Sequence, residues 1–297
     1  MTNEFRCGYI TIVGRPNVGK STLLNSLLEQ KLSITSRKPQ TTRWHILGIK
    51  SEKNHQAIYV DTPGLLDNKN NALTRHMRKE VLNSLDRVDI VVFVIESLLW
   101  NKEDEFVLEL LGKQQSPVIL VINKIDKVRN KDRLLPFMEK VSKKGKFMDV
   151  IPMSAAKKMN MDKLERSVFS RLPHAAAEYP EDQLTDRNER FYAGEFIREK
   201  LMRQLGDEIP YRMAVTVEEF SLKKNLLHID AVIWVEKEGQ KRIIIGKDGI
   251  VLKKAGTSAR KDMEAMFGHR VHLQTRVKVK KKWTDDMKAV KQFGYIN

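Results

Sequence analysis

The stretch GRPNVGKST, residues 14–22, constrains the fold of this chain more than any other segment. It lies between an apolar run, YITIV, and a leucine-rich run, LLNSLL. Gly14 and Gly19 let the backbone curl so that several N–H groups point inward, and a following helix adds its positive end. Strand, loop and helix in this order are the context that a phosphate-binding cradle requires. A chance glycine turn is the competing interpretation.

Apolar strands alternate with amphipathic helical stretches through most of residues 1–173. Helices are predicted at residues 20–30, 71–85 and 103–111. The predicted strands are YITIVG, HQAIYVDTPG, DIVVFVIES, PVILVINKID and DVIPMSA. This βαβ rhythm predicts a doubly wound, mostly parallel sheet with ligand chemistry at the carboxyl ends of its strands.

The rhythm stops near Pro173, where LPHAAAEYPEDQLTD reads as a linker. A helix is then predicted across RFYAGEFIREKLMRQL, followed by strands in MAVTVEEF and LLHIDAVIWVE. In KRIIIGKDGIVLKKAG, a β-branched strand is expected to lead through a turn into a helix that ends near Phe267. A strand, RVHLQTRVKVK, and a short terminal helix complete the chain. We therefore expect a first domain at 1–173, a linker at 174–187 and a smaller α+β domain at 188–297.

The distribution of charge suggests a partner for the second domain. The net charge is +16, and residues 241–291 hold 15 Lys and Arg against 5 Asp and Glu, a net +10. Such a concentration suggests an anionic polymer or surface, with a solvated basic face as the alternative. The single cysteine, Cys7, excludes an internal disulfide and suits a reducing compartment. No secretory signal is visible and the apolar runs are strand-sized, so we expect a cytoplasmic protein.

The side chains of the cradle predict binding of a magnesium nucleotide. Lys20 can reach β- and γ-phosphate oxygens, and the Ser21 hydroxyl can ligate Mg²⁺. The other expected contacts come from Gly14, Asn17, Val18, Gly19 and Thr22.

Two later segments predict which base is bound. NKID follows a strand, and the Asp126 carboxylate can accept both N1–H and the exocyclic amine of guanine. Adenine offers neither donor and would leave Asp126 unpaired, which supports discrimination. Lys124 can lay its stem along the ring, and Asn123 can brace the loop. The segment Ser154–Ala156, which includes Ala155, can place a backbone N–H near the guanine carbonyl. A lysine-rich surface turn is the alternative for NKID.

The segment DTPG also follows a strand. Asp61 can hold a Mg²⁺-bound water, and the Gly64 N–H can contact the γ-phosphate. Leu65 and Leu66, which follow, cannot orient an attacking water.

GRPNVGKST, SRKPQTTR, DTPG, NKID and MSA resemble, in this order, the motifs of the Era family of translation-factor-related GTPases. The likeness covers nearly the full chain. It implies GTP or GDP and Mg²⁺ as ligands. In this family the effector threonine lies in QTTR, which implies that Thr42 closes on Mg²⁺, with Thr41 as the alternative. The expected catalytic residues are Lys20, Thr42 and Gly64.

Related GTPases with an apolar residue after DTPG often rely on K⁺, held partly by an asparagine placed like Asn17. We therefore predict that K⁺ is a second cation and accelerates GTP hydrolysis. The alternative is that Asn17 only stabilises the turn of the loop.

The segment GKDG resembles the clamp of a KH module, which grips the backbone of a few nucleotides. Gly246 and Gly249 allow close approach of a phosphate backbone, and Ile250, Leu252 and Ala255 could form the groove wall. The expected RNA contacts are Gly246, Lys247, Asp248, Gly249, Lys253, Lys254 and Arg260. On the last strand, Arg276, Lys278 and Lys280 share one face; they could steer RNA or guard a sheet edge. A tight turn is the commonest alternative for the GxxG pattern.

The resemblance implies an α/β P-loop GTPase domain followed by a type II KH domain. It also implies binding to the 3′ end of 16S ribosomal RNA and a role in assembly of the 30S subunit, by a monomer. One alternative is a peripheral membrane GTPase whose basic carboxyl-terminal region binds anionic lipid of the inner membrane. Another is a metabolic kinase, which would not discriminate between bases.

Overall fold

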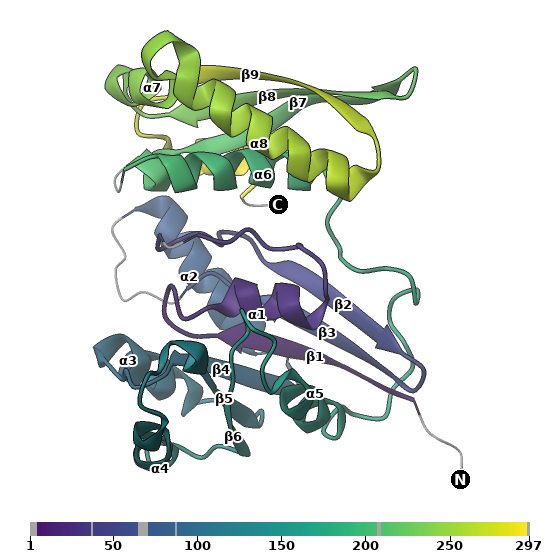
Figure 1. The fold of residues 1–297 in the computed structure, drawn as a ribbon, viewed down its shortest axis with the longest axis vertical. Coiled ribbons are helices and arrows are strands. Elements are labelled where there is room, and N and C mark those ends of the chain that lie inside the picture. The colour runs from purple at the N-terminus through teal and green to yellow at the C-terminus, as the bar shows by residue number, and fades with distance from the viewer. Residues whose placement is uncertain (1–4, 37, 65–70, 87, 207–208, 296–297) are drawn as a thin grey trace. The chain divides into compact units, whose positions relative to one another are not determined.

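The computed structural model describes residues 5–36, 38–64, 71–86, 88–206 and 209–295. Contacts divide the chain into two compact units, each with its own sheet (Figure 1). The first unit comprises the described parts of Met1–Ser33, Thr42–Lys69 and His76–Asp186. The second comprises the described parts of Ile34–Thr41, Asn70–Arg75 and Arg187–Asn297.

A six-stranded sheet in the order β2-β3-β1-β4-β5-β6 forms the centre of the first unit. Neighbouring strands are parallel except β2, which is antiparallel to β3. The expected doubly wound, mostly parallel sheet is thereby confirmed, although β2 had not been expected. The strands are β1 (Arg6–Val13), β2 (Ile46–Glu52), β3 (His55–Asp61), β4 (Ile90–Glu96), β5 (Val118–Asn123) and β6 (Asp149–Pro152).

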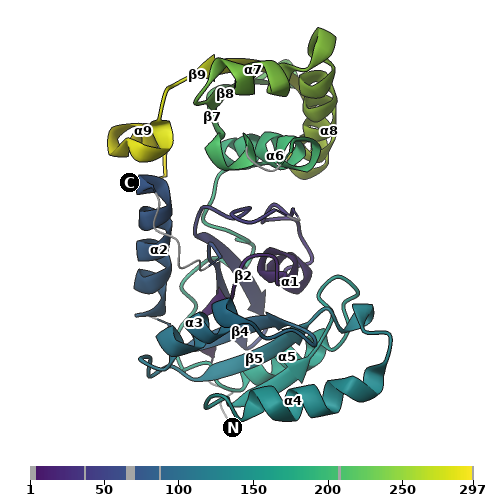
Figure 2. The same ribbon diagram turned by 90° about the vertical axis from the view of Figure 1, so that its left-hand side faces the viewer.

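Helices cover both faces of this sheet (Figure 2). Val81 of α2, Val107 of α3 and Val141 of α4 belong to one buried cluster on one face. On the other face, Leu24 of α1 packs against Gly48 of β2. The parallel strands are buried on both sides, which explains why they read as continuous apolar runs. The helices are α1 (Lys20–Leu27), α2 (Ala72–Leu85), α3 (Lys102–Leu111), α4 (Leu134–Ser142) and α5 (Met161–Phe169).

The segment after α5 runs along the first unit. The Gln56 amide donates to the Tyr179 carbonyl oxygen at 2.8 Å, and the Ile49 N–H donates to the Leu184 carbonyl oxygen at 2.9 Å. Residues up to Asp186 therefore add contacts beside β2 and β3, within the span that the sequence suggested as a linker.

The second unit has a three-stranded sheet in the order β7-β8-β9. β7 and β8 are antiparallel, whereas β8 and β9 are parallel. Helices α6 and α8 lie side by side on one face of the sheet (Figures 1 and 2), where the Phe196 and Phe267 ring centroids are 6.5 Å apart. This confirms the smaller α+β unit. Its elements are α6 (Glu189–Gln204), β7 (Ala214–Lys223), β8 (Leu226–Val235), α7 (Glu238–Ile245), α8 (Ile250–Phe267), β9 (Arg270–Val279) and α9 (Met287–Gln292).

One segment differs from the sequence expectation: KRIII ends helix α7 and is not a strand. Consecutive β-branched residues favour strands locally. Here the Gln240 side chain accepts the N–H groups of Glu236 and Lys237 at the amino end of the helix. Gly246, with φ 74°, ends it, and Ile244 is fully buried. Capping and tertiary packing therefore override the local preference.

Candidate nucleotide site and basic groove

The GRPNVGKST stretch forms the loop between β1 and α1. Gly19 has φ 104°, a conformation that favours glycine, and a Cβ there would lie 2.4 Å from the Asn123 side-chain nitrogen. Val18 is fully buried, whereas Asn17 is exposed and has φ 64°. The loop amides and the amino end of α1 can therefore hold an anion.

Lys20 lies against this loop and is only 6% exposed. Its Nζ donates to the carbonyl oxygens of Gly14 and Arg15, each at 3.0 Å. An ammonium has three donors, so one remains for a phosphate oxygen. Burial lowers the pKa of Lys20 to about 8, and the Asp61 carboxylate opposes this shift. A phosphate in the loop would oppose the cost of burial in the same way.

Three oxygen-bearing side chains meet at the carboxyl end of β3. Ser21 Oγ lies 2.7 Å from Thr42 Oγ1, which lies 3.4 Å from Asp61 Oδ2. Asp61 is fully buried, and its Oδ1 has no hydrogen-bond partner among the described residues. Burial raises the pKa of Asp61, against the opposing effects of Lys20 and of the hydroxyls of Ser33, Ser21 and Thr42.

This donor set fits Mg²⁺, which prefers oxygen ligands and keeps several waters. Ser21 and Thr42 offer hydroxyls, and Asp61 offers a buried oxygen that can accept from a bound water. The Thr41 hydroxyl instead donates to the Lys38 carbonyl oxygen at 2.6 Å. The geometry therefore favours Thr42 over Thr41 as the threonine beside the cation.

Asn123, the last residue of β5, connects three loops. Its side-chain N–H donates to the Val18 carbonyl oxygen at 2.8 Å. Its Oδ1 accepts the N–H groups of Lys124 at 2.8 Å and Ala155 at 3.0 Å. One buried amide thus joins the cradle, the NKID loop and the Ser154–Ala156 segment at the sheet edge where parallel α/β folds bind ligands.

Other side chains position the NKID residues. Ser154 Oγ donates to Asp126 Oδ1 at 2.6 Å, and Lys124 Nζ donates to Glu96 Oε2 at 2.7 Å. A carboxylate has about four acceptor sites, so Asp126 can still accept two N–H groups of a guanine. The Ala155 N–H is already bonded to Asn123, which leaves the Ala156 N–H for the guanine carbonyl.

Gly64 of DTPG approaches the cradle closely. A Cβ at this position would lie 2.9 Å from Pro16 Cγ and 3.0 Å from the Pro16 backbone nitrogen, so a side chain would clash. The Gly64 main chain therefore lies beside the phosphate loop. Leu65 and Leu66 lie outside the described residues.

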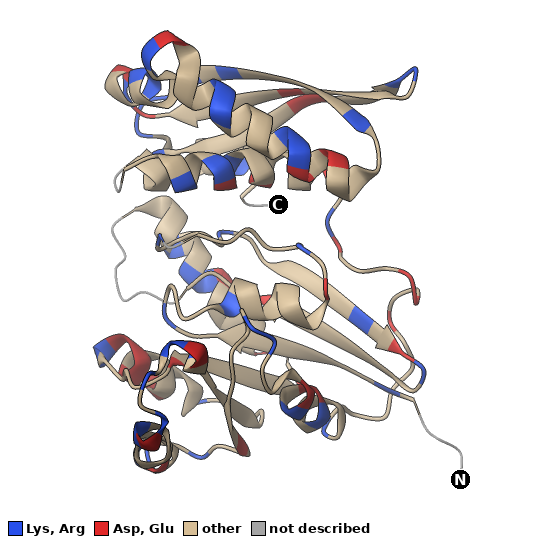
Figure 3. Cartoon of the chain, viewed as in Figure 1, with Lys and Arg blue, Asp and Glu red and all other residues tan. Residues whose placement is uncertain are grey.

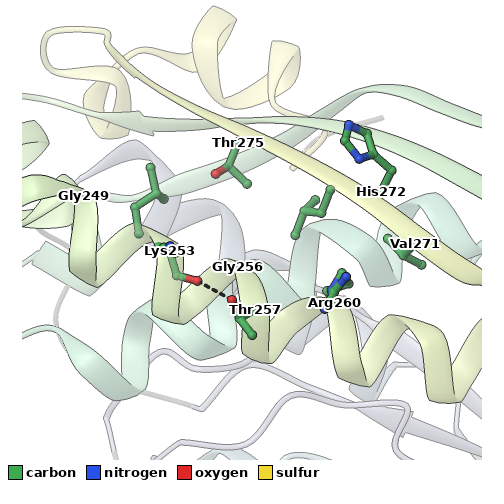
Figure 4. Close-up of a pocket in the computed structure, with 10 residues that line it drawn as sticks. Gly249, Lys253, Gly256, Thr257, Arg260, Val271, His272 and Thr275 are labelled. Carbon is green, nitrogen blue, oxygen red and sulfur yellow. Dashed lines mark hydrogen bonds between the residues drawn. The ribbon is translucent and has the colours of Figure 1, made fainter.

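A groove of about 410 Å³ runs between α8 and β9 in the second unit (Figure 4). Gly249, Lys253, Gly256 and Arg260 line it from the α8 side, and His272 and Thr275 line it from β9.

The GKDG turn begins this groove. Gly246 and Gly249 have φ 74° and 75°, and Lys247 and Asp248 are exposed at the tip. Of the expected RNA contacts on α8, Lys253 and Arg260 line the groove, whereas Lys254 is exposed outside its lining.

The expected apolar wall is only partly right. Leu252 lines the groove, but Ile250 is 63% exposed outside the lining and Ala255 is fully buried in the core. Gly256 was missed; a Cβ there would lie 3.9 Å from Leu273 Cδ2, so the groove floor has room. A glycine inside a helix costs about 1 kcal/mol of stability relative to alanine. A glycine in the middle of the predicted helix was therefore the sequence signal that could have pointed to a special role for Gly256.

The basic residues fall into two classes. On β9, Arg276 donates to Glu218 Oε2 at 2.7 Å, and Lys278 Nζ lies 3.6 Å from Glu218 Oε1. Lys253 and Arg260 have no carboxylate partner within the described part of the chain. Figure 3 shows Lys and Arg positions, drawn in blue, along α8. Lys253 and Arg260 therefore bring unpaired charge to the groove, whereas Arg276 and Lys278 of β9 lie close to the Glu218 carboxylate.

Two protein families match separate parts of this chain. Residues 9–124 match a family described as 50S ribosome-binding GTPase, and residues 208–284 match the KH domain family. GTPase Era of Marinobacter nauticus is 54% identical over 291 residues, covering 98% of this chain and 95% of that protein. GTPase Era of Azotobacter vinelandii is 50% identical over 293 residues, covering 99% and 98%.

Two solved structures are similar over almost the whole chain. One is Era in complex with MgGDPNP and nucleotides 1506–1542 of 16S ribosomal RNA, with a TM-score of 0.95 and 38% identity. The other is a variant of Aquifex aeolicus Era bound to GDP and AlF₄⁻, with a TM-score of 0.94 and 38% identity. Each of the two alignments covers 99% of this chain and 100% of the solved chain. Among the described residues, no helix has the length and apolarity needed to cross a membrane.

Proposed function

The chain belongs to the Era family of GTPases, and we propose that it is a GTP-hydrolysing switch that binds the 3′ end of 16S ribosomal RNA and assists assembly of the 30S subunit. The similar Era structure that carries both MgGDPNP and 16S nucleotides supports this proposal. We assign residues 1–173 to the GTPase domain, 174–187 to the linker and 188–297 to the KH domain. We also propose that the protein is cytoplasmic and monomeric.

At the nucleotide site, the cradle amides and Lys20 bind the β- and γ-phosphates. Negative charge on the phosphoryl oxygens is stabilised by the Lys20 ammonium and the Gly64 N–H as the γ-phosphoryl group is transferred to water. Two loop carbonyls already hold Lys20, so the ammonium needs little reorganisation during the reaction.

Cations complete this site in the proposal. Mg²⁺, bound through Ser21, Thr42 and a water on Asp61, neutralises charge on the phosphate oxygens. Asn17 is exposed at the rim of the loop, where its side-chain oxygen can help to hold K⁺.

At the RNA site, the GKDG turn clamps the backbone and the groove receives bases. Lys247 at the tip and Lys253 and Arg260 along α8 supply unpaired positive charge for phosphates. The open surface at Gly256 leaves space for a base against Leu273.

We further propose that the nucleotide state alters RNA binding. The segment Ile34–Thr41 clusters with the second unit, and the Thr35 N–H donates to Glu199 Oε1 of α6 at 3.0 Å. Helix α6 packs against α8, which lines the groove. A movement of Thr42 towards Mg²⁺ would therefore also move the adjoining segment Ile34–Thr41, which is hydrogen-bonded to α6.

The observation that carries the proposal is the bonding of Asn123 to three loops, because it brings a phosphate cradle and a guanine reader into one site. Calorimetry on the full chain with Mg²⁺ should detect GTP and GDP but not ATP. A fluorescent oligonucleotide with the 16S 3′-end sequence should bind the same protein, and a scrambled sequence should bind more weakly. Equal affinity for ATP and GTP would favour the kinase alternative.

The membrane alternative gains no support from the terminal helix. α9 spans Met287–Gln292, six residues, and exposes the lysines Lys288 and Lys291 together with Met287. An interfacial anchor needs a larger apolar face than this. Co-sedimentation with vesicles containing anionic lipid would test weak association directly.

A further inference from the structure

We propose that Ser33 is a positioning residue for Asp61 and sets the affinity of the nucleotide site for Mg²⁺. This inference rests on the proposed Mg²⁺ site at Ser21, Thr42 and Asp61. Ser33 lies outside every motif that the sequence suggested, yet it is 1% exposed and its Oγ donates to Asp61 Oδ2 at 2.8 Å.

Asn25 holds Ser33 in place through the main chain. Asn25 Oδ1 accepts the N–H groups of Leu32 at 3.0 Å and Ser33 at 2.8 Å. Asn25 Nδ2 donates to the Ser33 carbonyl oxygen at 2.7 Å. The Asn25 side chain thus makes three hydrogen bonds to the main chain of Leu32 and Ser33, which leaves the Ser33 main chain little freedom to move.

The same helix carries a proposed ligand and this support. Ser21 and Asn25 are four residues apart on α1, so they lie on one face of the helix, one turn from each other. Helix α1 therefore carries both the proposed ligand Ser21 and the side chain that holds the Ser33 main chain.

Ser33 makes the shortest hydrogen bond to Asp61. Oδ2 accepts the Ser33 hydroxyl at 2.8 Å and lies 3.4 Å from the Thr42 hydroxyl, whereas Oδ1 is buried and has no hydrogen-bond partner among the described residues. A carboxylate with one oxygen fixed cannot rotate freely, so Oδ1 keeps one direction in which to accept from a metal-bound water. Groups that orient ligands in this way typically change metal affinity by roughly 10- to 100-fold when they are removed.

A merely structural Ser33 would behave differently. If the hydroxyl only satisfied a buried polar group, its loss would weaken nucleotide binding to the same degree with and without Mg²⁺. A positioning role predicts a defect that appears only when Mg²⁺ contributes to binding.

The test measures release of a fluorescent GDP analogue from the full chain across a series of free Mg²⁺ concentrations. For Ser33→Ala we expect the Mg²⁺ midpoint to rise roughly 10- to 100-fold, with the release rate in EDTA unchanged. Ser33→Thr keeps the hydroxyl and should restore most of the response. Ser84→Ala is the matched control, because it removes a serine hydroxyl that donates to the Val81 carbonyl oxygen on α2.

The outcomes separate this inference from the proposed site. If Asp61→Asn leaves the Mg²⁺ midpoint unchanged, the proposed Mg²⁺ site itself is wrong. If Asp61→Asn shifts the midpoint but Ser33→Ala does not, only the role of Ser33 is overturned, as it is by equal defects with and without Mg²⁺. Thermal unfolding checks the fold, and Ser33→Cys, with a weak S–H donor, gives the same comparison if Ser33→Ala is unstable.

Discussion

At the scale of single residues, Ser154 controls how Asp126 can read a base. The Ser154 hydroxyl occupies one side of Asp126 Oδ1 at 2.6 Å. In Asp126→Asn this hydroxyl can still donate to the amide oxygen, which turns the amide NH₂ towards the ligand. Guanine then meets a donor opposite its own amine, whereas the C2 oxo group of xanthine meets a matching donor.

We therefore expect Asp126→Asn to bind XTP more tightly than GTP, with GTP affinity reduced at least about 100-fold, since two donors facing each other in a base-reading contact are strongly penalised. Competition binding with GTP and XTP measures this. Ser154→Ala in the Asp126→Asn background should weaken the XTP preference, because the amide orientation is released. Retained GTP preference in Asp126→Asn would contradict the guanine-reading role.

Asn17 carries the prediction about K⁺. Its side chain lies at the exposed rim of the cradle, where an added positive charge would stabilise the transition state. GTP hydrolysis should be faster in KCl than in NaCl at matched ionic strength, and Asn17→Ala should remove most of that difference. Equal rates of GTP hydrolysis by the unmodified chain in KCl and NaCl would indicate that Asn17 only stabilises the turn of the loop.

Sequence reasoning located the residues that face the nucleotide better than those that support them. Lys20, Asp61 and Asp126 belong to motifs whose spacing is visible in the chain. Ser33 and Glu96 do not: Ser33 bonds Asp61, and Glu96 bonds Lys124, each across 28 positions of sequence. Such pairs depend on which strand and loop ends meet in space, and one sequence without its fold does not state that.

At the scale of elements, strands buried on both faces were predictable because they form continuous apolar runs. β2 was missed, since ILGIKSE is an edge strand with a glycine and an exposed end, and so lacks a continuous apolar run. The α7 segment was misread as a strand because its apolar run is too short for periodicity to separate helix from strand. Both errors occur where tertiary contacts choose between two locally acceptable conformations.

The groove formed by α8 and β9 gives a prediction for Gly256. Gly256→Leu should project into the groove and reduce RNA affinity roughly tenfold or more, since losing the seat of one base forfeits about 1–3 kcal/mol. Stability should not fall, because a Cβ fits at 3.9 Å from Leu273 and leucine favours a helix over glycine. Fluorescence anisotropy with a 16S 3′-end oligonucleotide measures the affinity, and thermal unfolding measures the stability.

Gly239→Leu is the matched control, because a Cβ there meets no atom within 4 Å and the residue lies on α7 outside the groove lining. It makes the same change of residue type at a distance from the proposed bases. RNA affinity that fell equally in both variants would show that α8 does not hold the RNA through this groove.

At the scale of the whole molecule, the described Lys and Arg side chains fall into two groups, those with a carboxylate partner and those without one. Residues 241–291 hold 15 of the Lys and Arg against 5 Asp and Glu, but that count does not say which charges face RNA. Arg276 on β9 is paired with Glu218, whereas Lys253 and Arg260 have no carboxylate partner within the described residues. When a lysine or arginine without a partner binds an RNA phosphate, the counterion of that phosphate is released. A lysine or arginine that is already paired with a carboxylate must first break that ion pair.

This difference predicts the salt dependence of RNA binding. For single strands, the slope of log affinity against log salt is about −0.7 per neutralised phosphate. Lys253→Gln and Arg260→Gln should each make the slope shallower by about 0.7. Arg276→Gln should change it much less, because Glu218 already neutralises that guanidinium, although Arg276 is half exposed. Titrations of oligonucleotide binding across KCl concentrations measure all three. Equal changes for Arg276 and Lys253 would mean that RNA covers β9 as well as the groove, and the proposed binding surface would have to be redrawn.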